Sequence, residues 1–135
     1  MVTSESRQKL MKTLGEYGCY FLSVVHLAEE LTNKRIDAIQ SCLAAMDNKW
    51  LDDEITMLNP EAVLHSLTGK RFVVRKEEPA YSPKEGEYEV LLFRNGSFDH
   101  FVLGDGKGKV AYDPLGNSNS VASGKLTSKR IFKRI

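Results

Sequence analysis

The sequence predicts an α+β domain in which N-terminal helices pack on a C-terminal antiparallel sheet. Over about residues 1–69, apolar residues recur at the three- and four-residue spacing of helices. Over about residues 70–135, short runs rich in valine, leucine and phenylalanine are separated by glycine, proline and asparagine. The two patterns hardly alternate, which favours separate helical and sheet halves over a helix-wound parallel sheet. A chain of 135 residues is long enough for a core of its own, so we expect a single domain over residues 1–135.

Composition is that of an ordinary globular protein, with 41% apolar and 27% charged residues. A formal net charge of +1 provides no general attraction to nucleic acid, to membranes or to acidic substrates. No stretch reaches the length of a membrane span, and the first residues lack the apolar centre of a secretory signal. We therefore expect a cytoplasmic protein that binds no membrane, with Cys19 and Cys42 as free thiols.

Four helices are expected in the first half. Ser4 is the predicted cap of the first helix and Gly15 its end. Asn59 followed by Pro60 marks the start of the last, and Gly69 its stop. Residues 50–58 fit either a loop or an irregular strand. The helices are placed at about residues 4–12, 19–31, 34–47 and 61–67.

Five strands are expected in the second half, arranged as an antiparallel meander. The turn dipeptide Asn95-Gly96 joins two of them into a hairpin. The C-terminal segment, residues 125–135, mixes basic and apolar residues, and its expected role is an edge strand protected by lysines. The strands are placed at residues 71–75, 88–94, 98–104, 109–114 and 126–135.

Cys19 stands at the start of the second helix, where unpaired backbone N–H groups and the helix dipole favour a thiolate. A cysteine at a helix start is more often structural, so a nearby base is needed to support a catalytic role. Cys42 falls beside the apolar stripe of the third helix and is expected to be a small core residue.

His100 is the candidate base, and Asp113 the candidate group that orients it. If residues 106–107 form a two-residue hairpin loop, residue 100 pairs with residue 113, with β-carbons about 5 Å apart. A carboxylate there accepts a hydrogen bond from one imidazole nitrogen and leaves the other to take a thiol proton. Asp113 also fits a turn residue, and Asn117 or Asn119 replaces it as the orienting group if the register differs.

The order Cys19, His100, Asp113 resembles that of papain-like cysteine hydrolases. Residues 98–104, which read FDHFVLG, and residues 112–116, which read YDPLG, are similar to the His and Asp-Pro blocks of bacteriocin-leader-processing peptidases. Residues 17–23, YGCYFLS, resemble the opening of short uncharacterised proteins from bacterial plasmids and prophages. The resemblance implies a papain-like fold and a thiol hydrolase that acts on a peptide, protein or related amide.

One position departs from the papain-like pattern. Those enzymes usually carry a glutamine six residues before the cysteine as an oxyanion donor, and Thr13 stands there in this chain. Losing one such donor typically lowers the rate about 100- to 1,000-fold. Gln8 is a substitute only if the first helix returns it to the site. The departure motivates an alternative function, a catalytically silent papain-like protein of a phage or mobile element that binds a host protein.

The remaining motifs favour structural roles. Cys19, His26 and His100 lack close metal-ligand spacing, so neither a metal nor a cofactor is expected. Residues 104–108 resemble a phosphate-binding loop in composition, but they precede no helix. The basic segment 125–135 allows a third and weaker function, nucleic-acid contact, although a nucleic-acid partner is not expected.

Overall fold

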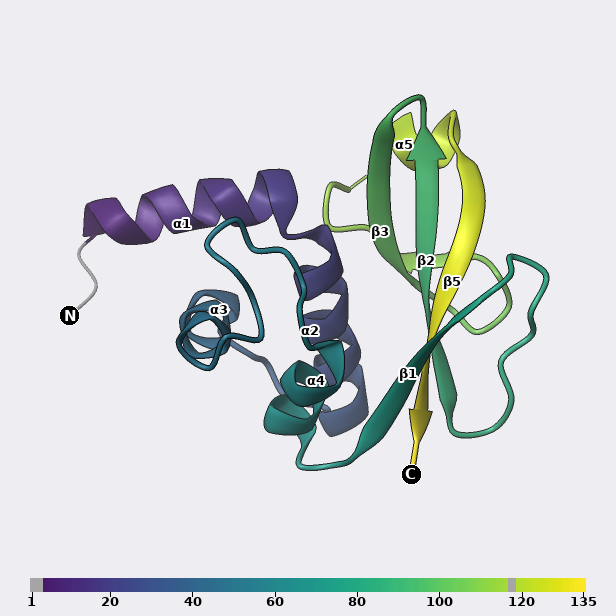
Figure 1. Ribbon diagram of the computed structural model, residues 1–135, viewed down its shortest axis with the longest axis horizontal. Helices are drawn as coiled ribbons and strands as arrows, with labels where there is room; N and C mark the ends of the chain where they lie inside the picture. The colour runs from purple at the N-terminus through teal and green to yellow at the C-terminus, as the bar shows by residue number, and fades with distance from the viewer. Residues whose placement is uncertain (1–3, 117–118) are drawn as a thin grey trace.

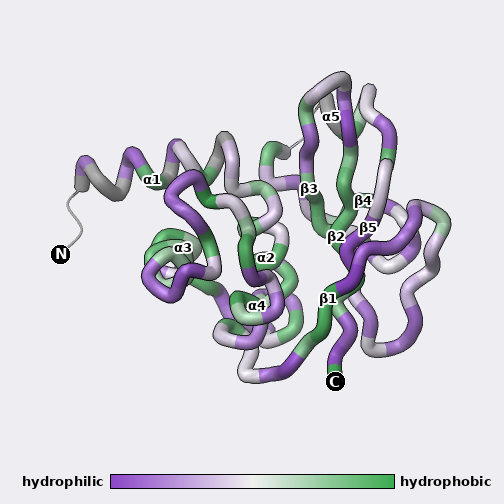
Figure 2. The backbone as a smooth tube through the Cα atoms, viewed as in Figure 1, coloured by the Kyte–Doolittle hydropathy of each residue, from purple (hydrophilic) through white to green (hydrophobic). Residues whose placement is uncertain are grey.

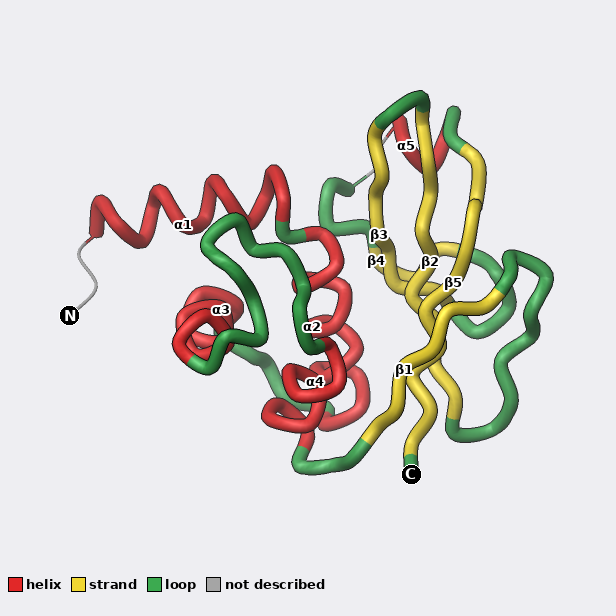
Figure 3. The backbone as a smooth tube through the Cα atoms, viewed as in Figure 1, coloured by secondary structure: helices red, strands yellow, loops and turns green. Residues whose placement is uncertain are grey.

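The chain forms an α+β structure in which four helices occupy one half and an antiparallel sheet the other (Figure 1). It is a computed structural model that describes residues 4–116 and 119–135. The elements are α1 (Ser4–Tyr17), α2 (Cys19–Thr32), α3 (Ala38–Asp47), α4 (Pro60–Thr68), β1 (Phe72–Glu77), β2 (Glu87–Asn95), β3 (Phe98–Gly104), β4 (Val110–Tyr112), α5 (Asn119–Ala122) and β5 (Lys125–Arg134). Figure 3 shows that a short connection from α4 to β1 joins the helical half to the sheet, while longer loops lie between α3 and α4 and between β1 and β2.

The sheet has the strand order β1-β5-β2-β3-β4, and each neighbouring pair is antiparallel. The expected simple meander and the expected edge position of residues 126–135 are therefore wrong, because β5 lies between β1 and β2. Ile131 and Phe132 of β5 are fully buried. The prediction took the lysines as a sign of an exposed edge, whereas Lys129 is buried and paired with Glu89.

Both faces of the sheet are covered. Along β3, Phe101 and Leu103 face the helical core, which also includes Phe132 of β5. Residues of the alternate parity, Leu91, Val102 and Ile131, are equally buried but lie outside that core cluster. The short α5 contacts β2, β3 and β5, behind the strands in Figure 1. His100 has the parity of Val102, so it lies on this second face.

Helix α2 is the central element of the helical half. Its apolar side carries Phe21, Val24, Leu27 and Ala28, each at most 2% exposed. Burying a side chain of the larger kind stabilises by about 1.5–3 kcal/mol. The helix contacts both α4 and β3, and Figure 2 shows hydrophobic stretches along α2. The first residue of α2 therefore has a well-defined place against the sheet.

Helix α1 is longer than predicted and does not end at Gly15. A glycine inside a helix costs only about 1 kcal/mol and does not force an end. The break comes at Gly18, whose N–H donates to the Leu14 carbonyl at 2.8 Å, while its carbonyl accepts from Leu22 N–H at 2.8 Å. A Cβ on Gly18 would lie 2.7 Å from the Leu14 oxygen, so this joint requires glycine.

The other helices follow their caps. The expected start of α3 at residue 34 is wrong, because Asp37 is the N-cap and its Oδ1 accepts from Ile39 and Gln40 N–H. Helix α4 is as predicted, with Asn59 as cap and Gly69 at φ 72° as stop. Residues 50–58 form a loop with one isolated β-bridge, Leu51 to Met57. Within the described residues, no helix has the length and apolar character needed to cross a bilayer.

We expect Asp37→Ala to lower the free energy of unfolding by about 1 kcal/mol, because α3 loses its cap. The matched control is Asp47→Ala, which removes an exposed carboxylate from the last residue of the same helix. A carboxylate at a helix C-terminus is unfavourable, so the control is expected to be neutral or slightly stabilising. Urea unfolding followed by circular dichroism compares the two variants, and equal losses would contradict the assigned cap.

Candidate functional site

Cys19 lies at the first residue of α2, and this turn is docked on β3. Its Sγ accepts a hydrogen bond from Phe101 N–H at 3.4 Å, and Ser23 Oγ donates to the Cys19 carbonyl at 2.7 Å. The Tyr20 ring stacks on Phe101 with centroids 4.3 Å apart. The β3–β4 hydrogen-bond ladder ends at the pair Leu103 and Tyr112. Phe101 lies beyond this end, and its N–H bonds to the Cys19 sulfur instead of to β4. The half-buried thiol is thereby held beside His100, the residue before Phe101.

His100 is fully buried and makes a short hydrogen bond to Asp113. The distance between His100 Nε2 and Asp113 Oδ1 is 2.6 Å. An ionised carboxylate only accepts hydrogen bonds, so the proton belongs on Nε2 and the neutral ring keeps Nδ1 as an acceptor. Nδ1 is buried and has no hydrogen-bond partner among the described residues. This nitrogen is the one available to Cys19.

The pKa of His100 shows that the ring interacts with both neighbours. Burial has the largest single influence and favours the neutral ring. The side chains of Cys19 and Asp113 act in the opposite direction, and together they raise the pKa above the ordinary 6.5. The thiol and the ring are thus neighbours, although Nδ1 and the sulfur do not form a hydrogen bond of good geometry. Such bonds are often long or poorly aligned before a substrate binds.

Asp113 reaches His100 although the predicted register is wrong. The prediction pairs residue 103 with residue 110, whereas the structure pairs Leu103 with Tyr112, and the loop is longer than two residues. A shift of two residues keeps the side chain on the same face and makes it a diagonal neighbour, still within reach of a long side chain. Asp113 follows the end of β4 and is also a turn residue, since its Oδ1 accepts from Leu115 N–H at 2.9 Å.

The other sequence candidates are a core cysteine, two asparagines that cannot be placed and a histidine on α2. Cys42 is fully buried, as expected for a core residue, and burial raises its pKa to about 11. Asn117 is outside the described residues, as is the side chain of Asn119. The His26 ring stacks on Tyr112 with centroids 4.0 Å apart. In the described ranges, no three His, Cys, Asp or Glu side chains are placed to hold a metal.

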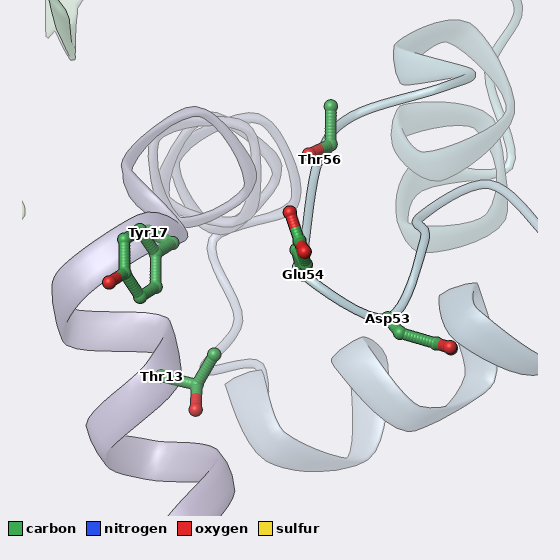
Figure 4. A pocket seen from close by; sticks show the side chains of 5 residues that line it. All are labelled: Thr13, Tyr17, Asp53, Glu54 and Thr56. Atoms are coloured by element: carbon green, nitrogen blue, oxygen red, sulfur yellow. The ribbon is translucent and has the colours of Figure 1, made fainter.

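Thr13 does not fill the place of the missing glutamine. Its Oγ1 donates to the Lys9 carbonyl at 3.0 Å. Together with four other residues it lines a cavity of about 460 Å³ between α1 and the 50–58 loop (Figure 4). Gln8 is exposed, roughly 13 Å farther along α1 than the end next to Cys19, and α1 points away from the sheet (Figure 1). The structure brings neither side chain to Cys19. The other cavity-lining residues are Tyr17, Asp53, Glu54 and Thr56.

Several supporting residues were missed by the sequence analysis. The stack of His26 on Tyr112 connects α2 to the end of β4, directly before Asp113. Ser23 ties α2 to β3, since its Oγ lies 3.4 Å from the Phe101 carbonyl as well. The only available signal was spacing, because His26 lies two turns after Cys19 on the same helix.

Comparison with known proteins assigns a family. The profile described as “Protein of unknown function, DUF261” matches residues 1–134. The chain belongs to this family. No curated protein and no solved structure matches the chain. The family agrees with the resemblance to short uncharacterised proteins, and by itself it points to no activity.

We expect NMR titration of the imidazole CH signals to give His100 a pKa above 6.5, and Asp113→Asn to lower it because the carboxylate charge is lost. A raised pKa in the folded state means that His100 stabilises the fold fully below its unfolded pKa. This contribution is lost as the pH rises through the folded value. His65, which is exposed, provides the internal control. An unchanged pKa of His100 in Asp113→Asn would contradict the contact assigned between the two side chains.

Proposed function

We propose that the chain is a cysteine hydrolase of papain-like fold, similar to peptidases and amidases, with Cys19, His100 and Asp113 as its catalytic triad. The observation that carries the proposal is the 2.6 Å bond from His100 Nε2 to Asp113, which leaves the buried Nδ1 without a partner among the described residues while Cys19 lies beside the ring. The support also includes the chain order of the triad and the docking of a helix-borne cysteine on β3, the strand that carries the histidine.

The chemistry follows from these placements. His100 Nδ1 accepts the Cys19 proton, and the thiolate sulfur adds to the carbonyl carbon of a peptide or related amide. The imidazolium then gives its proton to the leaving nitrogen as the C–N bond breaks, which leaves a thioester on Cys19. A water molecule, deprotonated by His100, cleaves the thioester and restores the thiol. Asp113 keeps the ring oriented and stabilises its charge throughout.

The backbone supplies the candidate oxyanion donor. The first hydrogen bond of α2 runs from Leu22 N–H to the Gly18 carbonyl. The N–H of Cys19 comes before Leu22 and takes no part in the hydrogen bonds within this helix. The positive end of the helix dipole adds to its effect on a developing oxyanion. With Thr13 bonded to Lys9, a second donor has to come from the backbone or from the substrate. We therefore infer a slow hydrolase.

The pH dependence of alkylation tests the proposal. We expect iodoacetamide to label Cys19 faster in the parent than in His100→Ala between pH 6 and 8.5, because His100 can accept the thiol proton as the sulfur reacts. In His100→Ala the rate should become steeply pH-dependent and fall about tenfold or more at pH 6, as for an ordinary thiol. Peptide mass spectrometry separates labelling at Cys19 from labelling at Cys42.

The comparison with Cys42 alone is not decisive. A buried thiol with a pKa of about 11 reacts slowly beside any half-exposed cysteine. The control is therefore His65→Ala, which removes an exposed histidine from α4, away from the site. The control should match the parent at every pH. Equal pH profiles for the parent and His100→Ala would disprove the activated thiol.

A second candidate function is a papain-like fold that binds a host protein without turnover. The position of Thr13 favours it, because the usual side-chain donor is missing and Gln8 lies elsewhere. Nucleic-acid contact has less support, since Lys129 is buried and Arg130 lies over the Phe101 ring, which removes two basic groups from the C-terminal segment.

Affinity capture from a bacterial lysate with the parent and with Cys19→Ala distinguishes the two functions. A hydrolase should release shortened products, while Cys19→Ala retains the uncut protein, because substrate binds but is not attacked. A pure binder should recover the same intact protein with both baits in equal amounts. Quantitative mass spectrometry of intact and truncated species measures the difference.

A further inference from the structure

Glu89 is the most deeply buried carboxylate in the described part of the chain, and the proposed mechanism does not use it. The side chain is 0% exposed. A buried carboxylate costs several kcal/mol unless its oxygens are paired. Oε1 accepts from Lys129 Nζ at 2.8 Å, and that ammonium also donates to the Tyr81 carbonyl. Oε2 accepts from both Gly106 and Gly108 N–H at 2.9 Å.

This carboxylate explains the glycine-rich segment that resembles a phosphate-binding loop. Gly106 and Gly108 have φ of 87° and 83°, which turns their N–H groups toward one point. The anion at that point is Glu89. Gly104 belongs to the same arrangement, because a Cβ there would lie 2.6 Å from Glu89 Cγ. The three glycines thus let the β3–β4 connection close over an internal carboxylate.

The β3–β4 connection depends on an anchor of this kind. Strand β4 has three residues and only two pairings with β3, with an irregularity between them. Two pairings define a register weakly, and a slip of one residue moves every side chain to the other face. Asp113 follows directly after β4. Its place beside His100 therefore depends on what holds the two ends of this short strand.

We propose that Glu89, supported by Lys129, is a positioning residue that sets the β3–β4 register and so delivers Asp113 to His100. Glu89 lies on the same sheet face as His100, since Val90 pairs with Leu103 and Phe93 with His100. It holds the loop end of β4, while the stack of Tyr112 on His26 holds the other end. The inference adds a residue to the proposed site and rests on the His100–Asp113 contact, not on turnover.

Two double variants separate the anchor from the charge. Glu89→Gln with Lys129→Gln keeps a carbonyl oxygen for both glycine N–H groups and removes both charges. Glu89→Leu with Lys129→Met removes the charges and the acceptor, and an apolar pair in place of a buried ion pair is often tolerated by the fold. Both pairs leave the net charge of the chain unchanged.

The readout is the pKa of His100 by NMR in a Cys19→Ala background, where Asp113 is the remaining partner that raises it. We expect the apolar pair to lower this pKa to the value of Asp113→Asn, and the polar pair to keep the parent value. Because the nucleophile is absent, the result is independent of whether Cys19 catalyses anything. Loss of stability alone does not move the pKa of a ring in the folded chain.

A folded apolar pair with the parent His100 pKa would overturn the proposal, as would equal shifts in both pairs. If the apolar pair does not fold, Gly106→Pro decides, because proline lacks the N–H and cannot adopt a φ of 87°. A lowered His100 pKa in Gly106→Pro supports the anchor, and an unchanged one refutes it. The polar pair remains the control.

Discussion

The contact between His100 and Asp113 is the constraint on which the rest of the site depends. A fully buried imidazole needs a partner for its N–H, and the 2.6 Å bond to Asp113 satisfies Nε2. The same bond assigns the tautomer and leaves Nδ1 buried and unpaired among the described residues, with Cys19 beside the ring. The proposed chemistry requires this contact, because it is the ring of His100 that takes the proton of Cys19 in that proposal. The buried polar pair therefore connects stability with the proposed chemistry.

Three separate segments have to meet for that contact to matter, and each is held by its own packing. Helix α2 is placed by its buried apolar side, which delivers Cys19 to the end of the β3–β4 ladder. Strand β3 is placed by its pairing with β2. The weakest of the three is β4, with two pairings, and it is held from outside by Glu89 at one end and by His26 at the other. The position of Asp113 thus depends on residues that are distant from it in the sequence.

Local signals in the sequence predicted most elements, and non-local pairing accounts for the errors. Capping and turn residues such as Asn59 and Gly69 act within a few positions, so α4 and the hairpin strands β2 and β3 are found where expected. The central position of β5 depends on partners more than thirty residues away, and its lysines indicated exposure. Lys129 could be recognised as buried only by knowing that Glu89 lies across the neighbouring strand. The Asp37 cap was a local signal that the helical periodicity around residue 34 concealed.

The contact between His100 and Asp113 was predicted through an incorrect register, and the reason is physical. Side chains alternate with a period of two, so an error of two residues exchanges a direct neighbour for a diagonal one on the same face. An error of one residue would have placed Asp113 on the helical side of the sheet, away from His100. Parity was therefore the part of the register that the contact between His100 and Asp113 needed. The bulge and the glycine turns at residues 104–108 account for the remaining difference between the predicted and the observed register. Glu89 bonds to these turns, so its buried carboxylate has a role beyond balancing the charge of Lys129.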